Sequence, residues 1–168
     1  MKFLTDWGLN RESWRGGRGE YWVLLQGLLM VGFVLLPVYR PWDLGSAGLR
    51  WTSWGVAAML GMGAIVLIGK GLLDLGKSLT PLPYPREDGV LVQTGVYGIV
   101  RHCLYGGLIL GALAGSIALW SLSHMMGVAV LFVFFDTKAS KEEVWLQEKY
   151  PEYTEYRQRV KKLIPWVY

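Results

Sequence analysis

Two short stretches of this sequence concentrate the side chains that could do chemistry, and each borders a long uncharged run. The first is Gly95–Gly107. On a helix, His102 and Tyr105 lie three positions apart and Gly98 and Gly106 each lie four from His102, so all four share one face. Two polar rings among glycines predict a notch that a ligand could enter. Taken alone, Arg101 and His102 are better explained as interfacial anchors that reach lipid phosphates.

The second stretch is 138–159, which carries lysines, glutamates, tyrosines and arginines. Its mixed charge is typical of a solvated helix, and this explains Glu148, Glu152 and Arg157 without any function. Glu142 and Glu143 differ, because they follow the uncharged run within about two helical turns. A carboxylate at this position could face the notch of the first stretch.

Glycines recur every fourth residue at Gly107, Gly111 and Gly115. Small residues at this spacing let another helix or a bulky ligand approach the backbone closely. Helix packing is the better explanation. Ligand approach near Gly115 requires that a polar group enters the helix bundle.

The elements that must position these side chains are long apolar blocks. The chain has 168 residues, 52% of them hydrophobic, and a mean hydropathy of +0.29, which is too apolar for an ordinary soluble domain. Residues 21–39 and 52–69 each have close to the roughly 20 residues that cross a bilayer as a helix. Residues 103–135 form a longer uncharged run with a break near 120–124, which predicts two antiparallel helices. We therefore expect an all-α polytopic membrane bundle of about four transmembrane helices in a single domain, 1–168.

The distribution of Lys and Arg predicts the orientation of these spans. The amino-terminal segment holds four, the 40–51 loop two, the 70–102 loop four, the 121 turn none and the tail after residue 135 seven. With four spans, 15 of the 17 basic residues lie on one side, which is then cytoplasmic together with both termini. No cleavable signal peptide is evident in residues 1–20, so the first span is expected to direct its own insertion.

Composition also excludes several functions. The single cysteine, Cys103, allows no internal disulfide, and two histidines without a C-x-x-C or H-E-x-x-H motif predict no metal site. A net charge of +4 is explained by anionic lipid headgroups rather than nucleic acid, since the basic residues border apolar spans. Many tryptophans and tyrosines lie at block edges, where the headgroup level favours them.

Two further elements are predicted beside the spans. Prolines at 81, 83 and 85 predict an extended, semi-rigid strap within the cytoplasmic loop. The fourth helix is expected to continue out of the membrane as far as Pro151. After it, Tyr153, Tyr156, Val160 and Leu163 recur at spacings of 3, 4 and 3, which predicts a short amphipathic helix beginning near Pro151.

The ordered motifs of the region from residue 70 to residue 168 resemble those of the isoprenylcysteine carboxyl methyltransferases, their bacterial relatives and the membrane phospholipid methyltransferases. That family has a Gly-x-Tyr stretch leading into Arg-His-Pro-x-Tyr before a helical hairpin. After the hairpin come Glu-Glu, Tyr-x-x-Tyr, Arg-Val and a late Pro. The corresponding residues here are Gly95-Val96-Tyr97, Arg101-His102-Cys103-Leu104-Tyr105, Glu142-Glu143, Tyr153-Thr154-Glu155-Tyr156, Arg159-Val160 and Pro165. Cys103 replaces the motif's proline.

The resemblance implies an S-adenosylmethionine-dependent methyltransferase that acts on a lipophilic acceptor entering from the bilayer and releases S-adenosylhomocysteine. It implies that the cofactor-binding half is approximately 70–168. The cofactor-binding residues it implies are Gly95, Tyr97, His102, Cys103, Leu104, Tyr105, Gly115, Ser116, Glu142, Tyr153 and Tyr156. It implies catalytic roles for Glu143 and Arg159. Lys138 falls at or near the position of a substrate-contacting arginine, although lysine lacks the bidentate geometry of arginine.

A carboxylate suits the cofactor's ammonium, His102 or Arg159 suits its carboxylate, and tyrosine ring faces suit its sulfonium. The acceptor stays open between a carboxylate, an amine and a small hydrophobic thiol. A carboxylate needs no general base, whereas an amine or thiol does, and Glu143 or His102 is then available. The alternative function is a small membrane transporter or an assembly subunit without catalysis. Proton-coupled transport is disfavoured because the spans carry no charge between their ends. The oligomeric state is not predicted.

Overall fold

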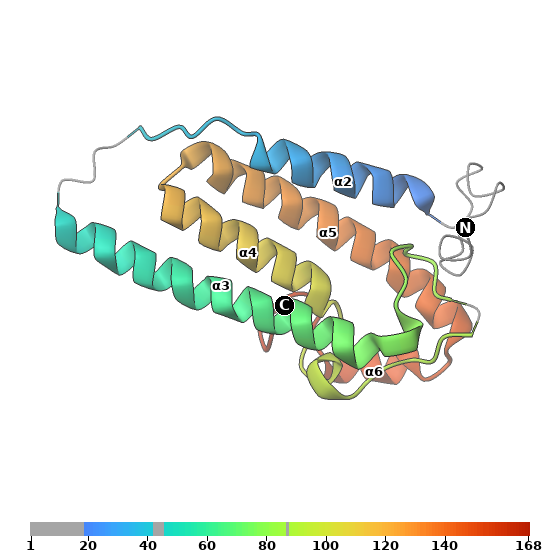
Figure 1. Ribbon diagram of the computed structural model, residues 1–168. Coiled ribbons are helices and arrows are strands. Elements are labelled where there is room, and N and C mark those ends of the chain that lie inside the picture. The colour runs from blue at the N-terminus through green and yellow to red at the C-terminus, as the bar shows by residue number, and fades with distance from the viewer. Residues whose placement is uncertain (1–18, 42–45, 87) are drawn as a thin grey trace.

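Helices account for nearly all regular structure in a computed structural model that describes residues 19–41, 46–86 and 88–168 (Figure 1). The four basic residues of the amino-terminal segment lie outside these ranges, and so do residues 1–18 of the segment in which no signal peptide is expected. The elements are α2 (Glu20–Val34), α3 (Ala47–Leu75), η2 (Gly76–Ser78), η3 (Gly95–Gly98), α4 (Cys103–Leu119), α5 (Leu122–Lys149) and α6 (Tyr153–Arg159). Within the described ranges there is no named strand, and a single isolated parallel bridge joins Val100 and Lys161.

The four long helices lie side by side, and α4 and α5 form the predicted hairpin (Figure 1). The chain reverses at Trp120, which adopts a left-handed conformation with φ 51°, and Ser121 caps α5 by accepting a hydrogen bond from the His124 backbone N–H. Two segments, Ala47–Ser78 and Leu122–Lys149, are long and apolar enough to cross a membrane, while α2 and α4 are shorter apolar helices. The expectation of an all-α helical membrane bundle is confirmed.

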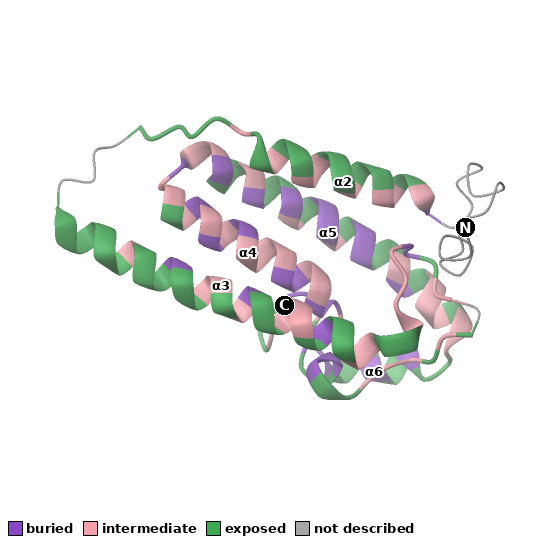
Figure 2. Cartoon of the chain, in the orientation of Figure 1, coloured by how far each residue is buried: buried purple, intermediate pink, exposed green. Residues whose placement is uncertain are grey.

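The outer surface of the bundle is apolar. Helix α2 has no buried residue, and on α3 only three small residues are buried (Figure 2). Leu28 and Val34 of α2, and Ile65 and Leu73 of α3, each expose more than 70% of their surface. Such a continuous apolar surface is unfavourable in water and suits the hydrocarbon of a bilayer.

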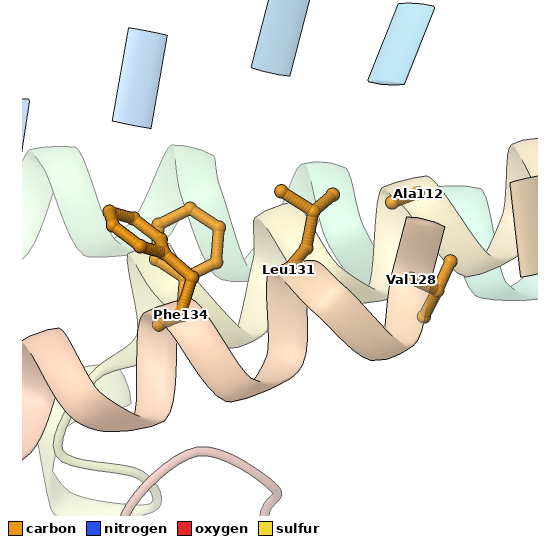
Figure 3. Packing of buried hydrophobic residues seen from close by; sticks show 5 residues of the cluster. Ala112, Val128, Leu131 and Phe134 are labelled. Carbon is orange, nitrogen blue, oxygen red and sulfur yellow. The ribbon is translucent and has the colours of Figure 1, made fainter. Parts of the chain in front are cut away.

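The buried core lies between the hairpin and α2. Leu131 and Phe135 of α5 are almost fully buried, and Val128, Phe134 and Ala112 complete the cluster (Figure 3). Helix α2 packs on this side, where Trp22 lies 5.7 Å from the ring of Phe134.

Small residues set the contact between α3 and α4, as the glycine register predicted. A Cβ at Gly107 would lie 2.6 Å from Ile68 Cγ1 and 3.2 Å from the Ala64 carbonyl, so only glycine permits this approach. At Gly111 the same test gives an ordinary 3.6 Å contact with Ala64, and at Gly115 no atom of the described residues lies within 4 Å. Close packing therefore explains the first glycine and leaves the third unexplained.

The helix bounds differ from the predicted spans. Helix α2 ends at Val34 rather than 39 because Pro37 cannot continue it, and the following segment docks on the hairpin tip, where Leu122 N donates to Tyr39 O at 2.9 Å. Helix α3 begins five residues early, capped by Ser46, and continues to Leu75 through Lys70 and Asp74. These charged residues end the apolar run but do not end the helix.

The carboxyl-terminal part also differs from its prediction. Helix α5 continues to Lys149 as expected, but α6 covers only Tyr153–Arg159 and begins two residues after Pro151. Val160 and Leu163 are buried as predicted, yet they lie beyond the helix. The helix ends early because the backbone after Arg159 pairs instead with residues 100–102.

Candidate functional site

A pocket of about 420 Å³ lies among the ends of α2, α3, α4 and α5, the strap and α6. Its polar wall includes Arg101, His102, Tyr105, Glu142 and Tyr153. Its apolar wall consists of Val23 of α2, Ile68, Leu72 and Leu75 of α3, and Leu104 and Leu108 of α4. One pocket thus joins charged groups to a surface that continues onto the apolar helices.

The polar wall begins where α4 begins. His102 occupies the N-cap position, and its imidazole stacks on the ring of Tyr105 with 5.5 Å between centroids and 4° between planes. The Tyr105 hydroxyl donates to Glu142 Oε2 at 2.9 Å. The predicted meeting of Glu142 with the His102–Tyr105 pair therefore exists in the structure.

The prediction of a notch beside His102 and Tyr105 is wrong. Gly98 belongs to η3 and precedes α4, so it does not share a helix face with His102 and Tyr105. The space beside Gly106 is filled, because the carbonyl oxygen of Leu163 lies where a Cβ would be. The backbone of the last residues, rather than a ligand, takes up the surface that the glycines leave free.

Glu143 is surrounded by basic side chains. Its Oε1 accepts from Arg101 Nε and Nη2, each at 2.9 Å, and lies 3.1 Å from His102 Nε2. Its Oε2 lies 3.3 Å from Arg157 Nε. The Arg101 and Glu143 side chains are buried, and a buried ion pair needs such saturation to offset the cost of desolvation. Glu143 therefore holds Arg101 and His102 in place from outside the pocket.

His102 lies between the two neighbouring carboxylates. Its Nε2 faces Glu143 at 3.1 Å, and its Nδ1 lies 3.8 Å from Glu142 Oε2. The ring plane is thus fixed by one carboxylate, by the stacked Tyr105 and by a longer contact to the other carboxylate. A ring held this way presents a constant surface to the pocket.

The segment 160–163 fixes the backbone beneath these side chains. Arg101 N donates to Lys161 O at 2.8 Å, and His102 N donates to Lys162 O at 3.0 Å. The Arg101 guanidinium also donates to the carbonyl oxygens of Arg157 and Val160. Lys162 is itself bound to α5, through Asp136 Oδ1 at 2.5 Å and Ser140 Oγ at 2.7 Å. Residues about 60 positions apart therefore build one wall.

Helix α6 contributes two buried tyrosines with different roles. The Tyr156 hydroxyl donates to Tyr97 O at 2.6 Å and so fixes η3. The Tyr153 hydroxyl has no hydrogen-bond partner among the described residues, although its side chain is 1% exposed and lines the pocket. Burial raises the pKa of the Tyr153 hydroxyl above its ordinary value, so the group is a protonated donor at neutral pH. A buried hydroxyl without a partner is costly, and a bound ligand would satisfy it.

Lys138 lies buried on α5 at the border between the polar and apolar walls. Its Nζ donates to Gln26 Oε1 of α2 at 2.5 Å and lies 5.0 Å from the ring centroid of Tyr105. No carboxylate of the described residues lies within ion-pair distance of Lys138. Its hydrogen bond goes to a neutral amide, and the Glu142 carboxylate acts on it only through a longer electrostatic interaction. A buried ammonium in this environment is suited to an anionic group of a ligand.

The strap closes the pocket on the side opposite α4. Leu79, Thr80, Pro81, Pro85 and residues 89–92 line it. The strap is bound to the end of α5, where the Tyr150 hydroxyl donates to Gly89 O at 2.6 Å, and it is closed on itself by hydrogen bonds between Ser78 and Val90. The proline-rich strap therefore forms a wall of the pocket, but it bends at residues 81–84 instead of running extended as the prolines predicted.

The predicted site residues divide into three groups. Those that line the pocket together are Tyr97, His102, Leu104, Tyr105, Lys138, Glu142, Tyr153 and Tyr156. Gly95, Cys103 and Glu143 lie directly behind them: Gly95 faces Asp74, whose Oδ2 accepts from Val96 N at 2.8 Å, and the Cys103 side chain packs at Gly71 of α3.

The other predicted residues lie farther away. Gly115 and Ser116 are ten or more residues along α4 from Tyr105, which corresponds to about 15 Å, and the Ser116 hydroxyl donates to Ala112 O. Arg159 is exposed and lies near Gln93 and Glu155. The pocket does not include any of the three.

Sequence reasoning missed three contributors. Gln26 is a lone amide in an apolar run, and its position there is a signal of a buried partner. The sequence indicates for Arg101 only a motif position and an interfacial anchor, whereas the structure places it in the pocket lining. The apolar residues of α3 that line the pocket gave no signal, because they resemble every other residue of a lipid-facing helix. Within the described ranges, no three His, Cys, Asp or Glu residues are grouped so that they could hold a metal ion.

The fold and site define a class, a helical membrane protein with a partly polar pocket at one end of its bundle. No protein-family model matches the chain. Among curated proteins, it is 31% identical over 121 residues to protein-S-isoprenylcysteine O-methyltransferase B of Arabidopsis thaliana, covering 70% of this chain and 61% of that one. It is 38% identical over 84 residues to the protein-S-isoprenylcysteine O-methyltransferase of Saccharomyces cerevisiae, covering 49% and 35%. The Schizosaccharomyces pombe protein of that name is 32% identical over 105 residues, covering 60% and 44%.

The chain is thus similar in sequence to protein-S-isoprenylcysteine O-methyltransferases, the family that its motifs resemble. The chain spans between about a third and three fifths of the length of these curated relatives. The relatives are named as O-methyltransferases, a class of enzyme that generally uses S-adenosylmethionine.

Proposed function

We propose that this protein is an integral membrane S-adenosylmethionine-dependent methyltransferase that acts on a lipophilic acceptor. The observation that carries the proposal is the composition of the pocket, in which Glu142 and the unpartnered Tyr153 hydroxyl share a cavity with apolar residues of α2, α3 and α4. A charged, water-soluble methyl donor and a hydrophobic acceptor need these two surfaces next to each other. The names of the relatives support the same activity.

The residues of the polar wall fit the cofactor. Glu142 carries the negative charge that suits an ammonium, and Tyr153 offers an unused donor. The Tyr105 ring face lies near the Lys138 ammonium, so it is available for a cation–π contact. A ring face of this kind also suits the positive charge of a sulfonium. When bound, S-adenosylmethionine supplies an electrophilic methyl group. Of the two basic residues considered for the cofactor's carboxylate, His102 lines the pocket and is the one we propose, because Arg159 does not.

For the acceptor, Lys138 is the residue we propose to contact substrate. Its ammonium lies at the border of the two walls, where it donates to the Gln26 carbonyl, lies near the Tyr105 ring face and interacts electrostatically with Glu142. A carboxylate acceptor fits this environment and needs no general base, whereas an amine or thiol does. Both oxygens of Glu143 are engaged by Arg101, His102 and Arg157, so we propose that Glu143 positions His102 rather than taking a proton.

The walls of the pocket align the methyl donor with the acceptor. The strap and α6 exclude water from the polar end, and the fixed His102–Tyr105 pair orients what binds there. We also propose that α2, α3, α4 and α5 all cross the bilayer and that the pocket, both termini and the 76–102 connection lie on the cytoplasmic side, following the distribution of basic residues.

Binding of S-adenosylhomocysteine tests the cofactor site. A ligand that binds only the folded state raises its apparent stability, so purified protein in detergent should show a higher melting temperature with the ligand. The absence of any shift at millimolar ligand would count against the proposal. Incubating membranes with methyl-labelled cofactor and identifying the labelled product would then identify the acceptor.

A further inference from the structure

The last residues of the chain form a compact turn with apolar side chains on its outside. Val167 N and Tyr168 N both donate to Ile164 O at 3.1 Å, and Leu163 N and Ile164 N both donate to Tyr168 O at 2.8 Å. At its tip Trp166 adopts a positive φ of 61°, a conformation that side-chain-bearing residues rarely take. Trp166 is 80% exposed and Val167 71% exposed.

The turn is fixed beside the end of the apolar part of α5. The Tyr168 ring lies 6.0 Å from the ring of Phe132, and the Tyr168 hydroxyl donates to Asp136 Oδ1 at 3.1 Å. Asp136 is the first charged residue after the long uncharged run 103–135. The turn therefore lies at the level where hydrocarbon gives way to headgroups, if α5 crosses the bilayer as its length and composition allow.

Its depth differs from that of α6. Helix α6 meets α5 near Glu143, whereas the turn meets α5 at Phe132 and Asp136. With a rise of 1.5 Å per residue, the turn lies about 10–16 Å nearer the middle of the bilayer than α6 does. In Figure 1 the carboxyl end likewise lies nearer the middle of the bundle than α6.

The apolar surface of the turn continues an apolar face of α5. Met125 and Ala129 precede Phe132 by seven and three residues, so they share its face, and both are exposed. Beside the turn, Lys161 is exposed and Lys162 is bound to Asp136. An exposed indole at the headgroup level and an exposed lysine five residues before it form the arrangement that interfacial lipid favours.

We propose that the turn Ile164–Tyr168 is a membrane anchor that inserts Trp166 and Val167 into the headgroup region of the bilayer that holds the helices. The occupant is lipid rather than protein, because the turn extends an exposed apolar face of α5, a helix long and apolar enough to cross a bilayer. The anchor has a structural consequence, since Lys161 and Lys162 hold the backbone of Arg101 and His102. Contact with the membrane surface thus stabilises one wall of the pocket. The proposal does not depend on methyl transfer.

Site-directed fluorescence measures the depth of the turn. The full-length protein, as Trp166→Cys labelled with bimane, is placed in nanodiscs that contain nitroxide lipids with the quencher at the headgroup, at acyl carbon 5 or at acyl carbon 12. The matched control is Gln158→Cys on the exposed face of α6, and the unsubstituted protein gives the background because Cys103 is buried.

We expect the headgroup and carbon-5 quenchers to quench the label at 166 at least about twofold more strongly than the label at 158. The carbon-12 quencher should quench either label less strongly than the headgroup and carbon-5 quenchers quench the label at 166. Aqueous iodide should reach 158 and spare 166. Equal quenching of both labels by iodide and by lipid would overturn the proposal. Loss of lipid quenching at 166 in discs that hold two copies, but not in discs with one, would also overturn it, because a second copy would then cover the turn.

Discussion

The imidazole of His102 and the ring of Tyr105 are stacked, with 4° between their planes and 5.5 Å between their centroids. The pair stands at the first turn of α4, with Glu143 bonded to one end of it and Glu142 to the other. Four elements therefore converge there: α4 supplies the rings, α5 supplies both carboxylates, and α6 and the 160–163 segment hold the backbone. The predictions below separate residues that hold this arrangement from residues that would bind a ligand.

The two tyrosines of α6 give a matched test. Tyr153→Phe removes a hydroxyl that has no partner, so the free energy of unfolding should not fall, and affinity for S-adenosylhomocysteine should drop by about 3–10-fold. Tyr156→Phe removes the hydrogen bond to Tyr97 O and should cost about 1 kcal/mol of stability with little effect on affinity. Calorimetric titration and thermal unfolding measure both. The reverse pattern would assign the ligand contact to Tyr156.

The adjacent carboxylates should respond oppositely to the same substitution. Glu143→Gln leaves Arg101, which is buried, without a counter-charge and should destabilise the protein by roughly 3 kcal/mol or more. Glu142→Gln keeps an acceptor for the Tyr105 hydroxyl and should cost less than about 1 kcal/mol, while weakening cofactor binding at least about tenfold. Equal binding by wild type and Glu142→Gln would remove Glu142 from the cofactor site.

The proposed role of Lys138 predicts a change in the acceptor alone. Lys138→Met should raise the KM for an anionic acceptor by about tenfold or more and leave affinity for S-adenosylhomocysteine within about threefold. Lys138→Arg keeps the charge and should recover part of the loss. Steady-state kinetics with one anionic and one uncharged acceptor distinguish a contact with the acceptor's charge from a general effect on the pocket. If both acceptors lose equally in Lys138→Met, the lysine acts on the structure of the pocket and not on the acceptor.

The glycine register of α4 predicts opposite effects at its two ends. Gly107→Ala places a methyl group 2.6 Å from Ile68 Cγ1 and should cost about 1–3 kcal/mol. Gly115→Ala meets nothing within 4 Å and should stabilise α4 by up to about 1 kcal/mol, because alanine favours helix more than glycine does. Unfolding in detergent measures both. A large loss of cofactor affinity in Gly115→Ala would support the role that the family resemblance implies for this residue.

The four-span topology predicts which single cysteines are labelled from each side. Asp88→Cys in the strap and Glu155→Cys on α6 should react from the same face of sealed vesicles, and Arg50→Cys near the start of α3 should react from the opposite face. Each position is exposed. Reaction of Asp88→Cys and Arg50→Cys from one face would show that α3 does not cross the bilayer.

The sequence predicted the helical bundle and the hairpin because long apolar runs and the polar break near 120–124 are local features. It also predicted that Glu142 meets His102 and Tyr105, since a hairpin returns the chain to its starting level. It did not predict that α3 continues through Lys70 and Asp74, because helical hydrogen bonds do not depend on apolar side chains. Nor could it predict that Leu163 fills the space at Gly106. That contact joins segments nearly 60 residues apart, and no periodicity records it.

The bridge between Val100 and Lys161 has a consequence for biosynthesis. When the ribosome has made α3, α4 and α5, the membrane can already hold them, yet the backbone of Arg101 and His102 still lacks its partners. The pocket wall closes only after residues 161 and 162 have left the ribosome. A nascent chain stopped before residue 160 should therefore insert into the bilayer as a hairpin with its neighbours and still fail to bind a ligand.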